Sequence, residues 1–143
     1  MKSRIFTLFL SVLLASFLYT ALADTPIDAL FTRIKNLPDA EYSEEKLNKS
    51  GLKGAFEGVK SIEVAEASID ETTYQTLRKE IVKSDYSPYE LLLDTQDGDA
   101  LVKIFMMKSK KKVTEVVILD LEKGEIDLVR FKGNLKSEIL KNK

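Results

Sequence analysis

The side chains that could do chemistry in this chain are carboxylates, lysines and hydroxyls. Its 143 residues include no histidine and no cysteine. Their absence excludes Ser-His-Asp and Cys-His catalysis, histidine proton shuttles and the usual zinc ligand sets. The sequence also contains no glycine-rich phosphate loop and no dinucleotide fingerprint. We therefore predict no cofactor and no enzymatic activity.

One cluster of carboxylates and one single carboxylate are candidates for a functional site. Asp94, Asp97 and Asp99 could hold a calcium ion, but their spacing does not match an EF-hand loop. We predict instead that they serve turn geometry and that the chain has no metal site. Glu115 is a charge among valines and could act as a buried acid. Because one carboxylate alone makes no active site, we favour a cross-strand ion pair with Lys132 or Arg130.

The densest group of basic residues lies in one turn. Lys110, Lys111 and Lys112 follow Lys108 and could touch anionic lipid or an acidic partner as a peripheral membrane contact. We favour a solvated turn that opposes aggregation. The whole chain has 22 basic and 23 acidic side chains. Near-neutral charge without a basic stripe argues against a nucleic-acid partner.

Residues 1–23 are predicted to be a signal peptide. Lys2 and Arg4 precede a long uncharged run, and Ala21, Leu22 and Ala23 form an A-x-A cleavage site before Asp24. The alternative is an uncleaved anchor, since the run is nearly long enough to cross a bilayer. With no cysteine after the site, the protein is not expected to be a lipoprotein. We expect export through the inner membrane and a periplasmic or secreted product.

Residues 24–143 are predicted to form a single α+β domain around a four-stranded antiparallel β-meander. Four runs rich in aliphatic and β-branched residues follow one another, separated by turn residues. They cover residues 89–94, 100–108, 113–121 and 125–132. The alternating residues 60–67 indicate a fifth strand. Two helices are expected to pack on the sheet and make a two-layer fold.

Both helices have clear start signals. The first begins at a Thr25 cap followed by Pro26, and the second covers residues 71–83 after an Asp70 cap. The expected apolar faces are Ile27, Leu30, Phe31 and Ile34 in the first helix and Tyr74, Leu77, Ile81 and Val82 in the second. The signals over residues 39–58 are weaker; there Ser43 is predicted to cap a short helix that ends at Gly51. A short tail helix is expected over Leu135, Ile139 and Leu140.

Three two-residue turns would fix the register of the meander. They are Asp97-Gly98, Lys110-Lys111 and Lys123-Gly124. The core face then carries Val117, Leu119 and Leu121 opposite Arg130, Leu128 and Ile126, with Glu115 opposite Lys132, and it includes Val102, Ile104 and Met106. The second face carries a candidate interaction surface formed by Phe105, Val116, Ile118, Val129 and Phe131. Since the central strands are apolar on both sides, we expect the chain's own tail, a twin subunit or a partner to cover this face.

Several of these segments resemble one known family. The run Lys112-Val-Thr-Glu-Val-Val-Ile-Leu119, the Gly133-Asn134-Leu135 that closes the last strand, and Tyr89-Glu-Leu before the Asp-Gly hairpin are similar to exported bacterial proteins of the domain of unknown function 4252 family. The resemblance covers the whole chain. It implies an envelope protein of Gram-negative bacteria with no assigned activity, and it carries over no catalytic residue.

The favoured function is a non-enzymatic periplasmic module that binds a protein or peptide on its sheet face. Monomers rarely leave a large apolar patch open, so the partner would be an unknown envelope protein or a second copy of the chain. One alternative is a metal-independent enzyme acting on envelope material, which needs two carboxylates that converge in a cleft. Another is a protein that associates with the membrane surface through the lysine turn.

Overall fold

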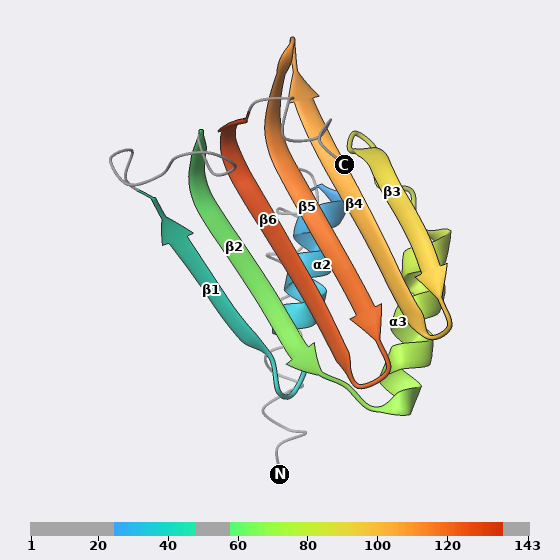
Figure 1. Cartoon of the computed structure of the whole chain (residues 1–143). Helices are drawn as coiled ribbons and strands as arrows, with labels where there is room; N and C mark the ends of the chain where they lie inside the picture. The colour runs from blue at the N-terminus through green and yellow to red at the C-terminus, as the bar shows by residue number, and fades with distance from the viewer. Residues whose placement is uncertain (1–24, 48–57, 136–143) are drawn as a thin grey trace, which may run out of the picture.

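The computed structural model describes residues 25–47 and 58–135 (Figure 1). The predicted signal peptide, with Ala21, Ala23 and Asp24, lies outside the described residues, as do residues 48–57 and 136–143. Among the residues described, no helix combines the length and the hydrophobicity that crossing a membrane requires.

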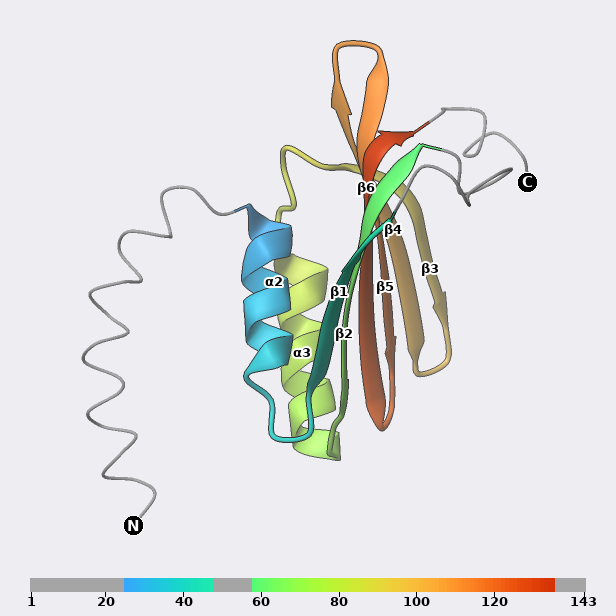
Figure 2. The same ribbon diagram turned by 90° about the vertical axis from the view of Figure 1, so that its left-hand side faces the viewer.

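A single open sheet of six antiparallel strands forms one layer, and two helices form the other. The strands are β1 (Glu41–Lys46), β2 (Val59–Ser68), β3 (Glu90–Asp97), β4 (Ala100–Ser109), β5 (Lys112–Glu122) and β6 (Glu125–Leu135). Their order in the sheet is β1-β2-β6-β5-β4-β3. Figure 2 shows both helices on the same side of the sheet. The predicted α+β class is confirmed, but the sheet has six strands rather than four or five.

The two helices begin where their capping residues predict. In α2 (Pro26–Lys35), the Thr25 hydroxyl accepts a hydrogen bond from Asp28 N, and the Asp28 carboxylate accepts one from Thr25 N, both at 3.1 Å. In α3 (Glu71–Lys83), the Asp70 carboxylate accepts a bond from Thr73 N at 2.8 Å. The predicted apolar faces are buried in both helices, except that Val82 is 52% exposed.

The helix predicted from Ser43 is wrong over the described residues, because Glu41–Lys46 form edge strand β1. The segment Glu-Tyr-Ser-Glu-Glu-Lys has little to bury, and all six residues are exposed. Pairing with β2 gives its backbone the hydrogen bonds that the sequence alone did not indicate. Tyr42 also packs edge-to-face on Phe31 of α2, with ring centroids 6.5 Å apart. Tertiary contacts therefore decide the conformation of this segment.

The main core lies between the helices and the sheet. The side chains that fill it come from α2, α3 and the inner face of strands β2, β4, β5 and β6. The predicted pairing of β5 with β6 is confirmed, with Val117 opposite Arg130, Leu119 opposite Leu128 and Glu115 opposite Lys132. The first turn of the meander is displaced by one residue: Asp97 pairs with Ala100, so Gly98 and Asp99 form it.

The predicted faces of β4 are exchanged. The turn at Lys110-Lys111 is as predicted, but the register shifts by one residue between Val113 and Glu115. Because side chains alternate with period two, this bulge at Thr114 moves every β4 residue beyond it to the other face. Phe105 is therefore core, 2% exposed and stacked near Tyr86 at 4.7 Å. The side chains predicted for the core face of β4 instead lie opposite the helices: Val102, Ile104 and Met106.

Candidate interaction surface

The face of the sheet opposite α2 and α3, here called the open face, carries two adjacent rows of apolar side chains. One row runs Leu93, Ile104, Ile118, Val129 and Val64 across five strands, and the next runs Met106, Val116, Phe131 and Ile62 across four. We call these nine residues the apolar band. Most of them are half-buried by their neighbours, and neither described helix covers them (Figure 2).

Four of the five predicted surface residues belong to this band. Val116, Ile118, Val129 and Phe131 lie on it, whereas Phe105 does not, because of the bulge at Thr114. The contribution of β2, namely Ile62 and Val64, was not predicted from the sequence. The alternation of residues 60–67 carried that signal, but only the sheet order places β2 beside β6.

One end of the apolar band merges into a second hydrophobic cluster. Val59, Met106, Val113 and Leu135 are 1–7% exposed there, with Val116, Phe131, Ile62 and Leu47 packed against them. Leu135 ends β6 instead of starting the predicted tail helix, so that part of the prediction is wrong. Ile139 and Leu140 lie outside the described residues.

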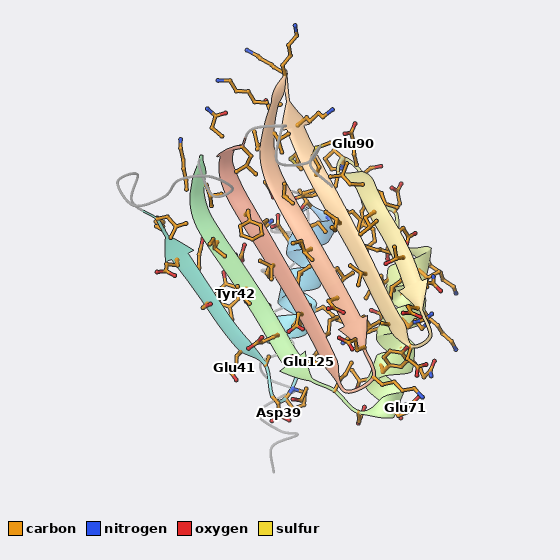
Figure 3. The ribbon with its side chains drawn as sticks, viewed as in Figure 1. Asp39, Glu41, Tyr42, Glu71, Glu90 and Glu125 are labelled. Atoms are coloured by element: carbon orange, nitrogen blue, oxygen red, sulfur yellow. The ribbon has the colours of Figure 1, made fainter. Side chains whose placement is uncertain are left out.

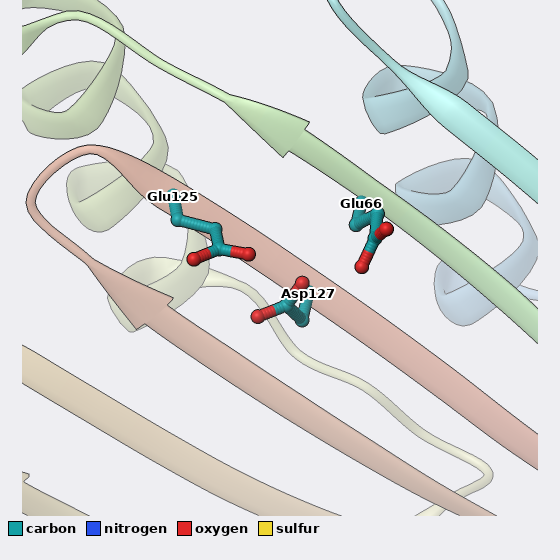
Figure 4. A group of neighbouring side chains, drawn as sticks. All are labelled: Glu66, Glu125 and Asp127. Carbon is teal, nitrogen blue, oxygen red and sulfur yellow. The ribbon is translucent and has the colours of Figure 1, made fainter.

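The other end of the band meets an acidic row. Asp120, Asp127, Glu66 and Glu41 lie directly opposite one another on four strands, and Glu125 joins them from the start of β6 (Figure 4). Carboxylate oxygens of Glu66, Glu125 and Asp127 lie within 4.8 Å of one another. Burial, followed by repulsion from Glu125 and Glu66, raises the pKa of Asp127 to about 6. Acids this close could hold a metal ion, but surface acids often cluster without one.

The acidic row has no cationic partner within the described part of the chain. Asp120 Oδ1 is buried and has no hydrogen-bond partner there. The ion pairs among the described residues include none of Glu66, Asp120, Glu125 and Asp127, and none of the turn lysines. Lys123, in the β5–β6 turn, pairs instead with Glu71 and Asp99 at 3.8 and 3.7 Å.

Glu115, the carboxylate singled out in the sequence, belongs to an ion cluster on the helix side of the sheet. It accepts a hydrogen bond from the Tyr89 hydroxyl at 2.6 Å and lies 3.5 Å from Arg130 Nη1. Arg130 also donates to Asp28 of α2 at 2.7 Å and to Glu63 of β2 at 2.6 and 2.9 Å. The predicted ion pair with Arg130 is therefore confirmed, as one contact of a larger cluster.

Burial and hydrogen bonds explain the pKa shifts of the groups in and beside this ion cluster. Burial raises the pKa of Asp28, but hydrogen bonds from Arg130 and Thr25 outweigh it, and the pKa lies below its usual value. Burial and the hydrogen bond to Glu115 raise the pKa of Tyr89 to about 12. Burial and Glu63 likewise raise the pKa of Tyr42. Arg130 is 5% exposed and already satisfied by carboxylates, so the cluster anchors α2 to the sheet rather than presenting a reactive group.

Gly133 marks the joint between β2 and β6. A side chain there would collide with the carbonyl oxygen of Gly58, and one at Gly58 would collide with the carbonyl oxygen of Asn134. Asn134 N donates to Gly58 O at 2.9 Å across the same joint. The close approach explains why the resembling segment needs glycine before Asn134 and Leu135.

A comparison with family models settles the family. The model of a domain of unknown function, DUF4252, matches residues 29–142. The chain belongs to the DUF4252 family. The resemblance drawn from the strand patterns is thus confirmed over both helices and all six strands of the DUF4252 domain, save the first residues of α2. Searches of curated proteins and of solved structures found no match to this DUF4252 domain.

Proposed function

We propose that this DUF4252 protein is an exported, non-enzymatic binding module of the bacterial envelope, and that it docks another protein on its open face. The observation that carries the proposal is the apolar band itself. It crosses five strands on the face that neither helix covers, whereas monomers seldom leave large apolar patches in water. The export part rests on the signal-peptide features of residues 1–23.

The acidic row beside the band indicates which side chains the partner should present. The acidic row includes a carboxylate oxygen without a partner among the described residues and three carboxylates that repel one another. A partner that presents apolar side chains to the band and a lysine or arginine to the acidic row would relieve that repulsion. A few residues near the centre of the band, such as Ile118 and Phe131, would then supply most of the affinity.

The test is site-specific photo-crosslinking in the native envelope. A photoreactive residue at Ile118, at the centre of the band, is expected to give one discrete adduct. The same residue at Val82, an exposed position on α3, is expected to give none. Adding Asp120→Lys and Asp127→Lys should abolish the Ile118 adduct while far-ultraviolet circular dichroism shows that the protein stays folded. Equal labelling at Ile118 and Val82, or no adduct at either position, would refute a docking surface.

A second variant separates docking from internal packing. Ile118→Asp with Phe131→Asp is expected to leave the protein folded in far-ultraviolet circular dichroism and to remove its bound partner. If this variant unfolds at room temperature, the face is part of the internal core and the proposal fails.

A further inference from the structure

The sheet gathers lysines from separate parts of the sequence at one end, here called the basic end. The lysine turn, Lys110 to Lys112, joins β4 and β5 there, and this hairpin projects beyond the other strands (Figures 1 and 2). β1, β2 and β6 each add one lysine at the same end: Lys46, Lys60 and Lys132. Strand pairing places Lys46 and Lys132 on either side of Ser61. The basic end is therefore a product of the sheet order as well as of the turn.

These lysines have no ion-pair partner among the described residues. All of them are exposed except Lys132, which is half-buried. Glu90, at the start of β3, already pairs with Lys108 at 3.8 Å, and Glu115 belongs to the cluster around Arg130. Glu45, next to Lys46 on β1, offsets a single charge. The basic end therefore presents excess positive charge to its surroundings.

The acids gather at the other end of the strands. The acidic row lies toward the β5–β6 turn, and Figure 3 shows the labelled acids Asp39, Glu41, Glu71 and Glu125 at that end. The near-neutral charge of the whole chain is thus separated along the strands. A molecule with this charge separation is drawn toward an anionic surface with its basic end first.

The hairpin at the basic end also offers a place for an anionic group. An open hollow of about 540 Å³ lies beside the turn and is lined by Ser109, Lys110, Lys111, Lys112 and Thr114. The Thr114 hydroxyl is engaged with Met107 O at 3.2 Å, which leaves the ammonium groups and the Ser109 hydroxyl as donors. Phosphate oxygens accept hydrogen bonds from both kinds of donor, and a charged donor makes the stronger bond. The lining therefore suits the phosphate of a lipid headgroup.

We infer that the basic end contacts an anionic membrane surface, with the lysine turn at the lipid headgroups. Each lysine held near such a surface raises the affinity by roughly fivefold. No acyl chain or amphipathic helix among the described elements adds to this attraction, so the contact should be reversible. The apolar band lies along the strands and not at their end, so the membrane contact leaves the open face free. The inference thus goes beyond the proposed docking function and does not depend on it.

The test is co-sedimentation of the processed protein with lipid vesicles. Binding is expected to vesicles that contain phosphatidylglycerol, to be absent with phosphatidylcholine alone, and to fall as salt is added. Changing the turn (Lys110→Gln, Lys111→Gln and Lys112→Gln) should weaken binding by roughly a hundredfold. The matched control removes the same charge from exposed lysines outside the basic end (Lys35→Gln, Lys79→Gln and Lys123→Gln) and should bind nearly as well as the parent. Far-ultraviolet circular dichroism checks that both variants are folded.

Three results would overturn the membrane contact. The first is the absence of binding to anionic vesicles, or equal binding to both kinds of vesicle. The second is an equal loss of binding in the turn variant and in the control, which would show that only net charge matters. The third is displacement by inorganic phosphate when sodium chloride of the same ionic strength has no effect, which would indicate a site for a free anion. None of these results bears on the Ile118 adduct, which tests the docking surface separately.

Discussion

Arg130 is the residue at which the helix layer and the sheet are joined. Its guanidinium contacts carboxylates from α2, β2 and β5 and lies 4.7 Å from the centre of the Phe31 ring. Desolvation makes such a buried ion cluster a modest net contributor to stability, but removing the single cation leaves three partly buried carboxylates without compensation. Removing Arg130 should therefore destabilise the protein by more than the intact cluster contributes to its stability.

Arg130→Met is expected to lower the free energy of unfolding by roughly 3–5 kcal/mol, measured by denaturant titration at neutral pH. Arg33→Met is the matched control, because the Arg33–Glu80 pair has both side chains about half exposed. That change should cost less than about 1 kcal/mol. Equal losses for the two variants would show that Arg130 is not the anchor of α2.

Asp127 sets a pH dependence of its own. Its pKa of about 6 in the folded protein lies above the usual value of 3.8, so the folded state holds the proton more tightly than the unfolded chain. The contribution of Asp127 to the free energy of unfolding is therefore fully present below about pH 4 and is lost as the pH rises through about 6. Asp127→Asn removes this loss, and the denaturation midpoint of dilute protein should therefore rise at pH 8 and change little at pH 4.

Glu44→Gln removes one charge from edge strand β1 and controls for the change in net charge. A midpoint for Asp127→Asn that rises equally at both pH values would contradict the assignment of the effect to Asp127 ionisation.

At the scale of elements, α2 is held by a fully apolar stripe. Ile27 and Ile34 are 0% exposed and Phe31 is 2% exposed. The apolar stripe predicted from the sequence spacing is therefore the face of α2 that packs on the sheet. The expected cost of Phe31→Ala is about 3–5 kcal/mol, because the change leaves a cavity and also removes the ring beneath Arg130. The free energy of unfolding from denaturant melts measures it.

Val82→Ala, at a 52% exposed position of α3, is the control and should change stability by less than about 0.5 kcal/mol. A loss below about 1 kcal/mol for Phe31→Ala would mean that α2 is not required for the packed core.

The two edge strands are protected by different means. β1 carries four charged residues among six. β3 exposes Leu91, Leu92 and Leu93 by 38–49%, but a register shift between Leu91 and Leu93 makes its ladder with β4 irregular. Charges and bulges both discourage strand addition by another chain. This favours the open face, rather than the edges, as the surface for association.

For the whole molecule, the main prediction from sequence is processing on export. Cleavage after Ala23 should leave Asp24 as the first residue, one position before the Thr25 cap of α2. Mass spectrometry of the envelope-localised protein is expected to give this N-terminus. An intact N-terminal Met1 in the membrane fraction would show instead that the segment is an anchor.

The sequence by itself determined the two capped helices, five of the six strands and the pairing of β5 with β6. Capping at Thr25 and Asp70, apolar spacing in the helices and the Lys123-Gly124 turn are local signals, and each acts over a few residues. Most of the candidate surface followed from the same patterns, since Val116, Ile118, Val129 and Phe131 lie on strands whose mutual register was predicted correctly.

Only the tertiary structure decided β1, the faces of β4 and the pairing of Arg130 with Asp28 and Glu63. A polar segment such as residues 41–46 becomes a strand because β2 offers it a free edge, which no local pattern encodes. One extra residue at Thr114 exchanges the two faces of β4, so Phe105 enters the core and Ile104 joins the open face. Arg130 meets Asp28 across 102 positions of sequence. Bulges and long-range ion pairs depend on contacts between elements that are distant in sequence. These contacts form only when the sheet and the helices pack together, so local sequence patterns do not predict them.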